Sequence, residues 1–161
     1  MVFAGPLAIA VRRWKLGAEP ALTPPLGSLL APSLARTLET TGGELLVPVP
    51  LHPRRLRQRE FNQASLLARA ARARAHCTIP VEEALDRVVD TPPQSRLPAK
   101  ARKQNVKRAF AVPRPAAIRG RHVILVDDVV TTGSTASACA TTLLEAGAAR
   151  VDLLALARAL P

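Results

Sequence analysis

The sequence has few aromatic residues and lacks acidic residues over a long central stretch. Its 161 residues include three Phe, one Trp and no Tyr. Single-strand nucleic-acid binders of the OB and RRM types stack bases on several aromatic side chains, so this composition argues against such a platform. Residues 91–126 contain no Asp or Glu but carry nine basic residues, which are Arg96, Lys100, Arg102, Lys103, Lys107, Arg108, Arg114, Arg119 and Arg121. Either a solvated arm or a mobile cover over an anionic ligand would account for that charge.

Cysteines and long apolar runs are scarce as well. Cys77 and Cys139 have no CxxC spacing, so neither a zinc finger nor a disulfide framework is predicted. This cysteine usage fits a reducing cytoplasm. The apolar residues 3–11 are too few to span a bilayer, and no small-residue cleavage site follows them. We therefore expect a cytoplasmic protein without a membrane span or a signal peptide.

Positive charge, by contrast, is abundant. The chain has 23 Lys and Arg residues against 12 Asp and Glu residues, for a formal net charge of +11. Anionic partners are therefore expected, namely nucleic acid, phosphorylated metabolites or a membrane surface. The length and the 48% hydrophobic content predict a single globular domain over residues 1–161.

The pattern of apolar residues predicts an α/β fold with a mostly parallel sheet flanked by helices. The expected elements are helical pieces over 1–43, a strand at 44–49, a loop at 50–60, a helix capped by Asn62, a short strand at 85–89, a strand at 123–126, a helix at 134–146 and a strand at 151–155. Pro48 either places its strand at a sheet edge or ends it. The last strand–helix–strand unit predicts a parallel strand pair.

The segment VDDVVTTGST, residues 126–135, joins the strand at 123–126 to the helix that follows. Ligands of open α/β sheets bind beyond the carboxyl ends of the strands. Gly133 permits close backbone approach, and the N–H groups at a helix start bind anions, so the TTGST segment (residues 131–135) favours a phosphate group. The acid pair, Asp127 and Asp128, repels phosphate but accepts hydrogen bonds from a vicinal diol. A sugar phosphate satisfies both features.

With its flanking strand, ILVDDVVTTGST resembles the phosphoribosyl pyrophosphate signature of the type I phosphoribosyltransferases. The resemblance implies that Asp127 and Asp128 bind the ribose 2′ and 3′ hydroxyls and act as the catalytic residues beside the reacting carbon. It also implies a 5′-phosphate site made of Thr131, Thr132, Gly133, Ser134 and Thr135. An ordinary strand-to-helix turn with a hydroxyl-rich cap is the alternative interpretation.

Two further blocks narrow the resemblance. VPVPLHPRRLRQREFNQASLLAR and LDRVVDTPPQSRLPAKARKQNVKRAF resemble blocks of the competence protein ComF family, and GPLAIAVRRWKLG resembles the stretch that precedes them. The match has a core of about residues 44–157. Many family members begin with a four-cysteine zinc ribbon, which is absent here, and Glu60 stands where the family usually has Gly.

The resemblance also implies a type I phosphoribosyltransferase-like fold with a flexible hood that closes over pyrophosphate. The candidate pyrophosphate and hood residues are His52, Arg54, Arg55, Arg102 and Lys103. For each of them an exposed, solvated surface position is the alternative. Mg²⁺ is expected to be held by the oxygens of the ligand, with no direct ligand from the protein.

Two functions are compatible with these residues. The first is a phosphoribosyl pyrophosphate-binding protein that could act as a phosphoribosyltransferase, by displacement of pyrophosphate at ribose C1. The second is a non-catalytic DNA-uptake or regulatory protein that binds DNA and retains the ligand site. The sequence identifies neither an acceptor substrate nor an oligomeric state, and a homo-oligomer is compatible with it.

Overall fold

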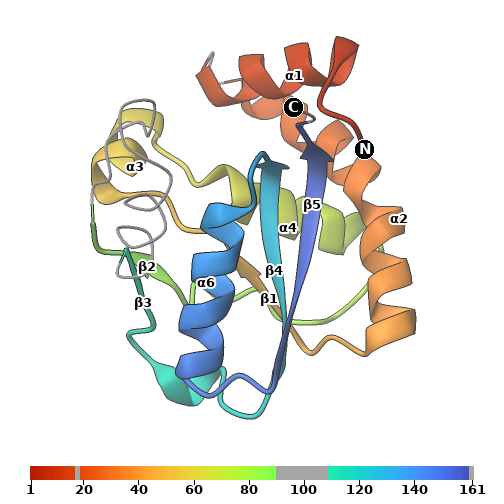
Figure 1. Ribbon diagram of the computed structural model, residues 1–161. Helices are drawn as coiled ribbons and strands as arrows, with labels where there is room; N and C mark the ends of the chain where they lie inside the picture. The colour runs from red at the N-terminus through yellow and green to blue at the C-terminus, as the bar shows by residue number, and fades with distance from the viewer. Residues whose placement is uncertain (17–18, 90–108, 160–161) are drawn as a thin grey trace.

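The computed structural model describes residues 1–16, 19–89 and 109–159 (Figure 1). Its elements, in chain order, are α1 (Gly5–Leu16), η1 (Pro20–Leu22), α2 (Thr23–Thr41), β1 (Leu45–Pro48), α3 (Pro53–Arg59), α4 (Gln63–Arg74), β2 (Asp86–Arg87), β3 (Phe110–Ala111), η3 (Pro115–Ala117), β4 (His122–Val130), α6 (Ser134–Glu145) and β5 (Arg150–Arg158). No helix in these ranges is long and apolar enough to cross a membrane.

The main sheet has the strand order β1-β4-β5, and both strand pairs are parallel, as the sequence predicts. β4 lies in the centre, where Leu125 is opposite Val47 of β1 and Leu153 of β5. A central parallel strand is covered on both faces, which explains the unbroken apolar run at 123–126. Pro48 is the last residue of β1, at the edge of this sheet, which satisfies both interpretations of that proline.

The side chains of β4 alternate between two hydrophobic clusters, one on each face of the sheet. Val123 and Leu125 pack in the cluster that includes Cys139 of α6. Ile124 and Val126 pack in the other cluster, with the buried side chains of α1, α2 and α4. In Figure 1, α6 covers one face of the sheet while α2 and α4 lie on the other. The helices thus leave the carboxyl ends of the strands as the edge where a ligand could enter.

Helix α1 lies across those carboxyl ends, above β4 and β5 (Figure 1). Val11 and Trp14 are fully buried, and the Trp14 indole N–H donates a hydrogen bond of 3.0 Å to the Thr23 hydroxyl. The backbone N–H of Phe3 donates to the carbonyl of Arg158 at the end of β5, at 2.8 Å. These contacts fix the position of α1 over the candidate site.

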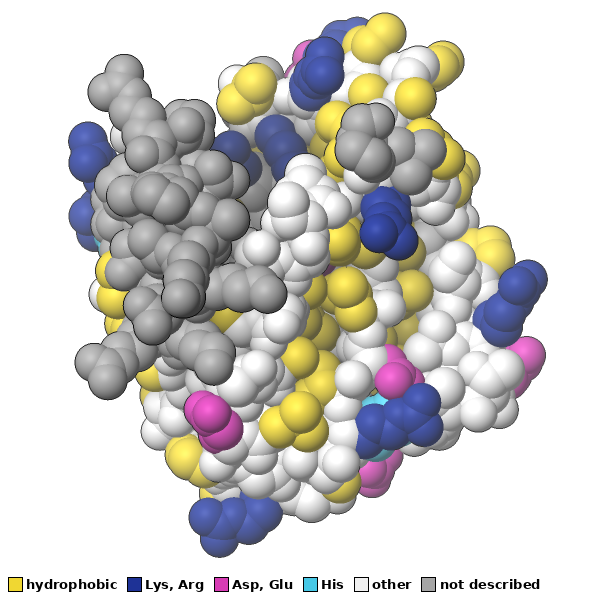
Figure 2. All heavy atoms as spheres, viewed as in Figure 1, with side chains coloured by type: hydrophobic (Ala, Val, Ile, Leu, Met, Phe, Trp, Pro, Cys, Tyr) yellow, Lys and Arg dark blue, Asp and Glu magenta, His cyan; other side chains and the backbone are white. Residues whose placement is uncertain are grey.

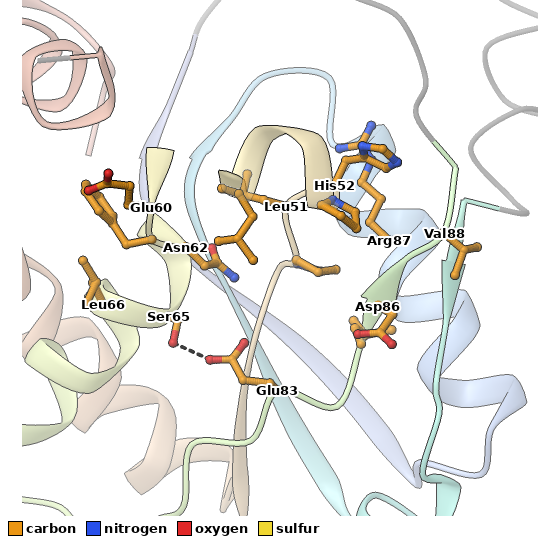
Figure 3. Close-up of a pocket in the computed structure, with 15 residues that line it drawn as sticks. Leu51, His52, Glu60, Asn62, Ser65, Leu66, Glu83, Asp86, Arg87 and Val88 are labelled. Carbon is orange, nitrogen blue, oxygen red and sulfur yellow. Dashed lines mark hydrogen bonds between the residues drawn. The ribbon is translucent and has the colours of Figure 1, made fainter. Parts of the chain in front are cut away.

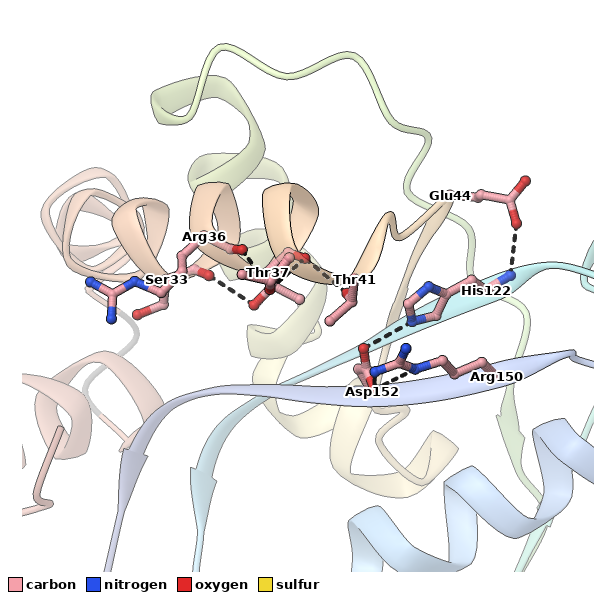
Figure 4. Close-up of polar contacts among 9 residues, drawn as sticks. Ser33, Arg36, Thr37, Thr41, Glu44, His122, Arg150 and Asp152 are labelled. Carbon is pink, nitrogen blue, oxygen red and sulfur yellow. Dashed lines mark hydrogen bonds and ion pairs between the residues drawn. The ribbon is translucent and has the colours of Figure 1, made fainter.

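A polar cluster closes the opposite, amino end of the sheet (Figure 4). His122 of β4 and Asp152 of β5 interact through Nε2 and Oδ2 at 2.9 Å, and the His122 backbone N–H donates to Glu44 at 2.9 Å. Burial alone would raise the pKa of Asp152, but hydrogen bonds from Thr41, His122 and Arg150 outweigh burial and lower it. The cluster connects β4 to β5 and to the segment before β1, far from the carboxyl ends.

The structure corrects the prediction of a loop over 50–60, because residues 53–59 form helix α3. Pro53 occupies the first helical position, where its missing N–H is not needed. His52 caps the helix by accepting from the Arg54 N–H, and Glu60 ends it at a φ of 65°. The two caps and the proline at the first helical position therefore favour a helix in a segment whose prolines suggest a loop.

Two other predicted boundaries are wrong. The strand expected at 123–126 continues to Val130, because Val129 and Val130 pair with Ala157 and Arg158 of β5. The strand expected at 85–89 is limited to the two residues of β2, which pair antiparallel with β3. The predicted hood residues Arg102 and Lys103 and the first half of the acid-free stretch fall within residues 90–108, which lie outside the described residues.

Candidate functional site

A small cavity of about 50 Å³ lies where β4 turns into α6. It is lined by Asp127, Val129, Val130, Thr131, Thr132, Gly133, Ser134, Thr135 and Ala136. Gly133 precedes α6 at a φ of 75°, a conformation that glycine adopts without a steric penalty. The structure therefore brings all five predicted phosphate residues into one cavity, together with one residue of the acid pair.

The hydroxyl groups of the TTGST segment lie close together. Thr132 Oγ1 and Ser134 Oγ are 2.9 Å apart, and the Ser137 N–H donates to the Gly133 carbonyl at 2.8 Å in the first turn of α6. The side chains of Thr131 and Thr132 are exposed. Hydroxyl donors and the N–H groups of a twelve-residue helix thus meet at an accessible cavity, which is the chemistry that holds a phosphate group.

Asp127 contributes a carboxylate with an unusual pKa to this cavity. Burial, followed by the adjacent Asp128 charge, raises the pKa of Asp127 to about 7. The N–H of Asp128 donates to Asp127 Oδ1 at 2.8 Å, and this bond and the Lys15 charge oppose the increase. Near neutral pH the Asp127 carboxyl group therefore exchanges readily between its charged and neutral forms.

Asp128 has a different environment from Asp127. It is 8% exposed and does not line the cavity of the TTGST segment. Its Oδ1 atom accepts from the ammonium group of Lys15 on α1 at 2.8 Å and from the Val129 N–H at 2.5 Å. The acid pair is thus divided: Asp127 lines the cavity of the TTGST segment, and Asp128 is held by the N-terminal helix.

Helix α3 adds a second positive charge near Asp128. Burial and the Arg55 charge lower the pKa of Arg59, and the Asp128 charge partly offsets them. Arg59 therefore lies close enough to both groups to interact with their charges.

The predicted pyrophosphate residues are distributed differently from the phosphate residues. His52 caps α3 through Nδ1, which accepts from the Arg54 N–H at 3.3 Å, and lines a second cavity. The side chain of Arg54 is exposed and that of Arg55 is half-buried, both on α3. Arg102 and Lys103 lie outside the described residues. The structure thus gives His52 a helix-capping role in addition to any ligand role.

The second cavity, of about 660 Å³, lies between α3, the start of α4 and the segment around β2 (Figure 3). Its lining combines apolar side chains with carboxylates, and it includes Leu51, Leu56, Phe61, Leu85, Glu60, Glu83 and Asp86. Glu83 accepts a hydrogen bond from the Ser65 hydroxyl at the cavity wall. His52 and Arg87 also line the cavity, so it offers apolar, acidic and basic groups together. Such a lining suits a ligand with an apolar body and polar edges.

The fully buried amide of Gln63 lies at the start of α4, beside the cap residue Asn62. Gln63 is 1% exposed, and neither its Nε2 nor its Oε1 has a hydrogen-bond partner within the described part of the chain. The Asn62 amide, in contrast, donates to the Val49 carbonyl at 3.2 Å and accepts from the Ala64 N–H. Asn62 therefore connects α4 to the end of β1, while Gln63 is an uncompensated polar group in the core.

The thiol of Cys139 lies near Asp127 but adds no reactive group to the site. Burial, followed by the Asp127 charge, raises the pKa of Cys139 to about 12, so its thiol stays protonated and unreactive. Across residues 1–16, 19–89 and 109–159, no three His, Cys, Asp or Glu side chains are grouped in a way that could hold a metal ion.

Comparison with known proteins identifies the family. A phosphoribosyl transferase domain model matches residues 77–160. DNA utilization protein YhgH of Escherichia coli (strain K12) is 38% identical over 161 residues, covering 98% of this chain and 70% of the relative. Competence protein F of Haemophilus influenzae is 35% identical over 162 residues, covering 96% of this chain and 69% of the relative. The chain belongs to the competence protein F family.

Solved structures agree with the fold of this ComF-family protein. The allosteric regulatory enzyme of purine biosynthesis matches with a TM-score of 0.53 and 24% identity over 83% of this chain. Glutamine phosphoribosylpyrophosphate amidotransferase from B. subtilis matches with a TM-score of 0.52 and 21% identity. This chain covers only 25% and 26% of those proteins, so the likeness concerns the fold. The fold is the α/β, type I phosphoribosyltransferase-like fold that the signature implies.

Sequence reasoning missed Lys15 as a site residue. Lys15 lies 113 residues before Asp128 along the chain, so no local pattern connects them. One signal was available: the chain has four lysines, and the other three are Lys100, Lys103 and Lys107. Outside residues 100–107, every basic residue except Lys15 is an arginine, which sets this position apart in the sequence.

Proposed function

We propose that this ComF-family protein binds phosphoribosyl pyrophosphate beyond the carboxyl end of β4. The observation that carries the proposal is the cavity that unites Asp127 with residues 131–135. A 5′-phosphate would accept hydrogen bonds from the N–H and hydroxyl groups of the TTGST segment. The carboxylate of Asp127 would accept from a ribose hydroxyl, and Asp128 would do so from the adjacent hydroxyl.

In this proposal Mg²⁺ binds together with the ligand, through the oxygens of the ligand. Pyrophosphate and ribose oxygens are hard donors of the kind that Mg²⁺ prefers, and the cation would neutralise the leaving group. The charges of Lys15 and Arg59 near the acid pair fit an anionic ligand in the same region. We also propose a cytoplasmic location, where such a ligand and the free thiols of Cys77 and Cys139 would be compatible.

If the protein turns the ligand over, the reaction would be displacement at ribose C1. The bond from C1 to the pyrophosphate oxygen breaks, and its electron pair leaves with pyrophosphate. A lone pair of the acceptor forms the new bond to C1, and an N–H acceptor would lose its proton to solvent or to the departing pyrophosphate. Positive charge develops on the ribose ring, and the ionised acid pair beside the hydroxyls would stabilise it. The second cavity suggests an acceptor with an apolar body and N–H donors.

Calorimetry with three ligands tests the binding proposal. Phosphoribosyl pyrophosphate with Mg²⁺ should bind most tightly. Ribose 5-phosphate should bind more weakly because it lacks the pyrophosphate contacts, and inorganic pyrophosphate more weakly again because it lacks both the ribose and the 5′-phosphate contacts. Equal affinity for pyrophosphate and for the complete ligand would show that the ribose and 5′-phosphate contacts do not exist. Release of pyrophosphate in the presence of a panel of nucleobases tests whether turnover follows binding.

DNA binding is the second candidate function, and two observations favour it. The relatives at 35–38% identity are a DNA utilization protein and a competence protein, and this chain has a net charge of +11. In Figure 2 the Lys and Arg side chains of the described residues are spread around the visible face and do not form one continuous patch. A basic patch or stripe is the usual footprint of a backbone-binding surface, so support for DNA binding comes from the relatives and the net charge and not from this face.

The salt dependence of binding tests this second function. Affinity for a labelled single-stranded oligonucleotide should fall steeply between about 50 and 200 mM salt, because each neutralised phosphate releases counterions. The slope of affinity against salt gives the number of phosphate contacts. Absence of binding at low salt, or a flat response, would remove DNA binding from consideration.

A further inference from the structure

The ion pair between Lys15 of α1 and Asp128 of β4 lies outside the lining of the TTGST cavity, so a phosphate site there does not explain it. Lys15 Nζ lies 2.8 Å from Asp128 Oδ1, and the two side chains are only 25% and 11% exposed. Removing two charged groups from water is costly, and an ion pair at the surface contributes little to stability. A gain in stability therefore does not explain why this ion pair lies at the acid pair.

The rest of α1 holds Lys15 in place. Trp14, the residue before it, is fully buried and hydrogen-bonded to Thr23. Residues 2 and 3 are attached to the end of β5 through the Phe3 N–H and a β-bridge at Val2. On an unattached helix the ammonium group of Lys15 would sample many positions, whereas these contacts hold it beside Asp128.

We infer that Lys15 is a positioning residue of the ligand site: it orients the Asp128 carboxylate and supplies positive charge to the acid pair, so that both acids accept from the ligand's diol. The inference rests on the proposed function and adds α1 to the site. Lys15 and the Val129 N–H both engage Oδ1, which fixes the direction in which the carboxylate presents its other oxygen. Since the acids would otherwise repel an anionic ligand, the lysine also reduces that repulsion.

Titratable groups from three other elements lie near the acid pair, and one of them, the Cys139 thiol, is neutral. Lys15 is on α1, Arg59 on α3 lies near Asp128, and Cys139 on α6 lies near Asp127. On β5 the residue opposite Asp127 is Ala155, which carries no charge. The Lys15 charge lowers the pKa of Asp127, so its removal should shift the ionisation of Asp127 to higher pH.

The test measures the affinity for phosphoribosyl pyrophosphate with Mg²⁺ across pH 6–9. Lys15→Met should weaken binding at pH 7 by about tenfold or more and move the midpoint of the pH profile upward, because less of the acid pair is ionised. Lys15→Arg keeps the charge and should recover most of the affinity. Arg13→Met is the matched control, since Arg13 is on the same helix but pairs with Glu19, away from the acids.

A double-mutant cycle with Asp128→Asn separates a role through Asp128 from a general effect on folding. In the Asp128→Asn background, Lys15→Met should cause little further loss, since the partner carboxylate is already gone. The inference is overturned if Lys15→Met keeps the wild-type affinity and pH midpoint, if Lys15→Arg is as weak as Lys15→Met, or if the two losses simply add. Absence of binding by the wild-type protein would instead refute the proposed function.

Discussion

At the scale of single residues, the site combines groups that work against one another in the absence of a ligand. Asp127 and Asp128 are adjacent like charges, and burial raises the pKa of Asp127 to about 7. Lys15 compensates part of this unfavourable charge from another element. Such an arrangement costs stability, which is typical of residues kept for ligand binding.

The free energy of unfolding should reveal that cost through its dependence on pH. Because the pKa of Asp127 is about 7 in the folded protein against an ordinary value of 3.8, folding favours its neutral form. Its contribution to stability is therefore fully present below pH 3.8 and is lost as the pH rises through about 7. Asp127→Asn should become more stable than wild type by roughly 2–4 kcal/mol over that window.

Urea denaturation at several pH values between 4 and 8 measures this difference. Glu39→Gln, which removes an exposed carboxyl group on α2, controls for the loss of one negative charge. A constant difference between Asp127→Asn and wild type across this range would mean that Asp127 is not buried with a raised pKa.

At the scale of elements, the site depends on how closely helices pack under it. Gly27 of α2 faces α4, and a Cβ atom at that position would lie 2.5 Å from the Ala70 Cβ and 2.9 Å from the Ala70 carbonyl carbon. The absent side chain lets α2 and α4 approach each other beneath β4. α4 in turn carries Asn62, which connects to the end of β1 at the Val49 carbonyl.

Gly27→Ala should therefore destabilise the protein by about 1–3 kcal/mol in urea denaturation, because the added methyl group forces the two helices apart. The better helix propensity of alanine offsets only part of that cost. Adding Ala70→Gly to Gly27→Ala removes one of the two close contacts. The double variant should therefore lose less free energy of unfolding than the sum of the two single losses. A Gly27→Ala protein as stable as wild type would show that α2 and α4 are not in this close contact.

At the scale of the whole molecule, local sequence signals predicted most of the fold. The apolar run at 123–126 and the small-residue helix after it identify β4 and α6, since both signals lie within one short segment. Helix α3 was missed because it is only seven residues long, begins at Pro53 and follows another proline, Pro50. The end of β4 was misplaced because its last pairs depend on β5, a separate strand.

The candidate site, like the fold, has one part that the local sequence predicts and one part that it does not. All five phosphate residues come from one continuous segment, so their meeting at one cavity could be predicted from their spacing. The ion pair of Lys15 with Asp128 joins residues 113 positions apart, and it arises only when α1 packs over the carboxyl ends of the strands. Contacts of this kind require the tertiary structure, because no local pattern encodes them.

The affinity of the Asp127→Ala, Asp128→Ala double variant for phosphoribosyl pyrophosphate tests the central claim most directly. Calorimetry with Mg²⁺ should show binding by the wild-type protein and a loss of about 100-fold or more in the variant, since in the proposed complex each carboxylate would form a charged hydrogen bond with the ribose diol. Circular dichroism would verify that the variant is folded. Unchanged affinity in a folded variant would contradict the assignment of the acid pair to the ligand site.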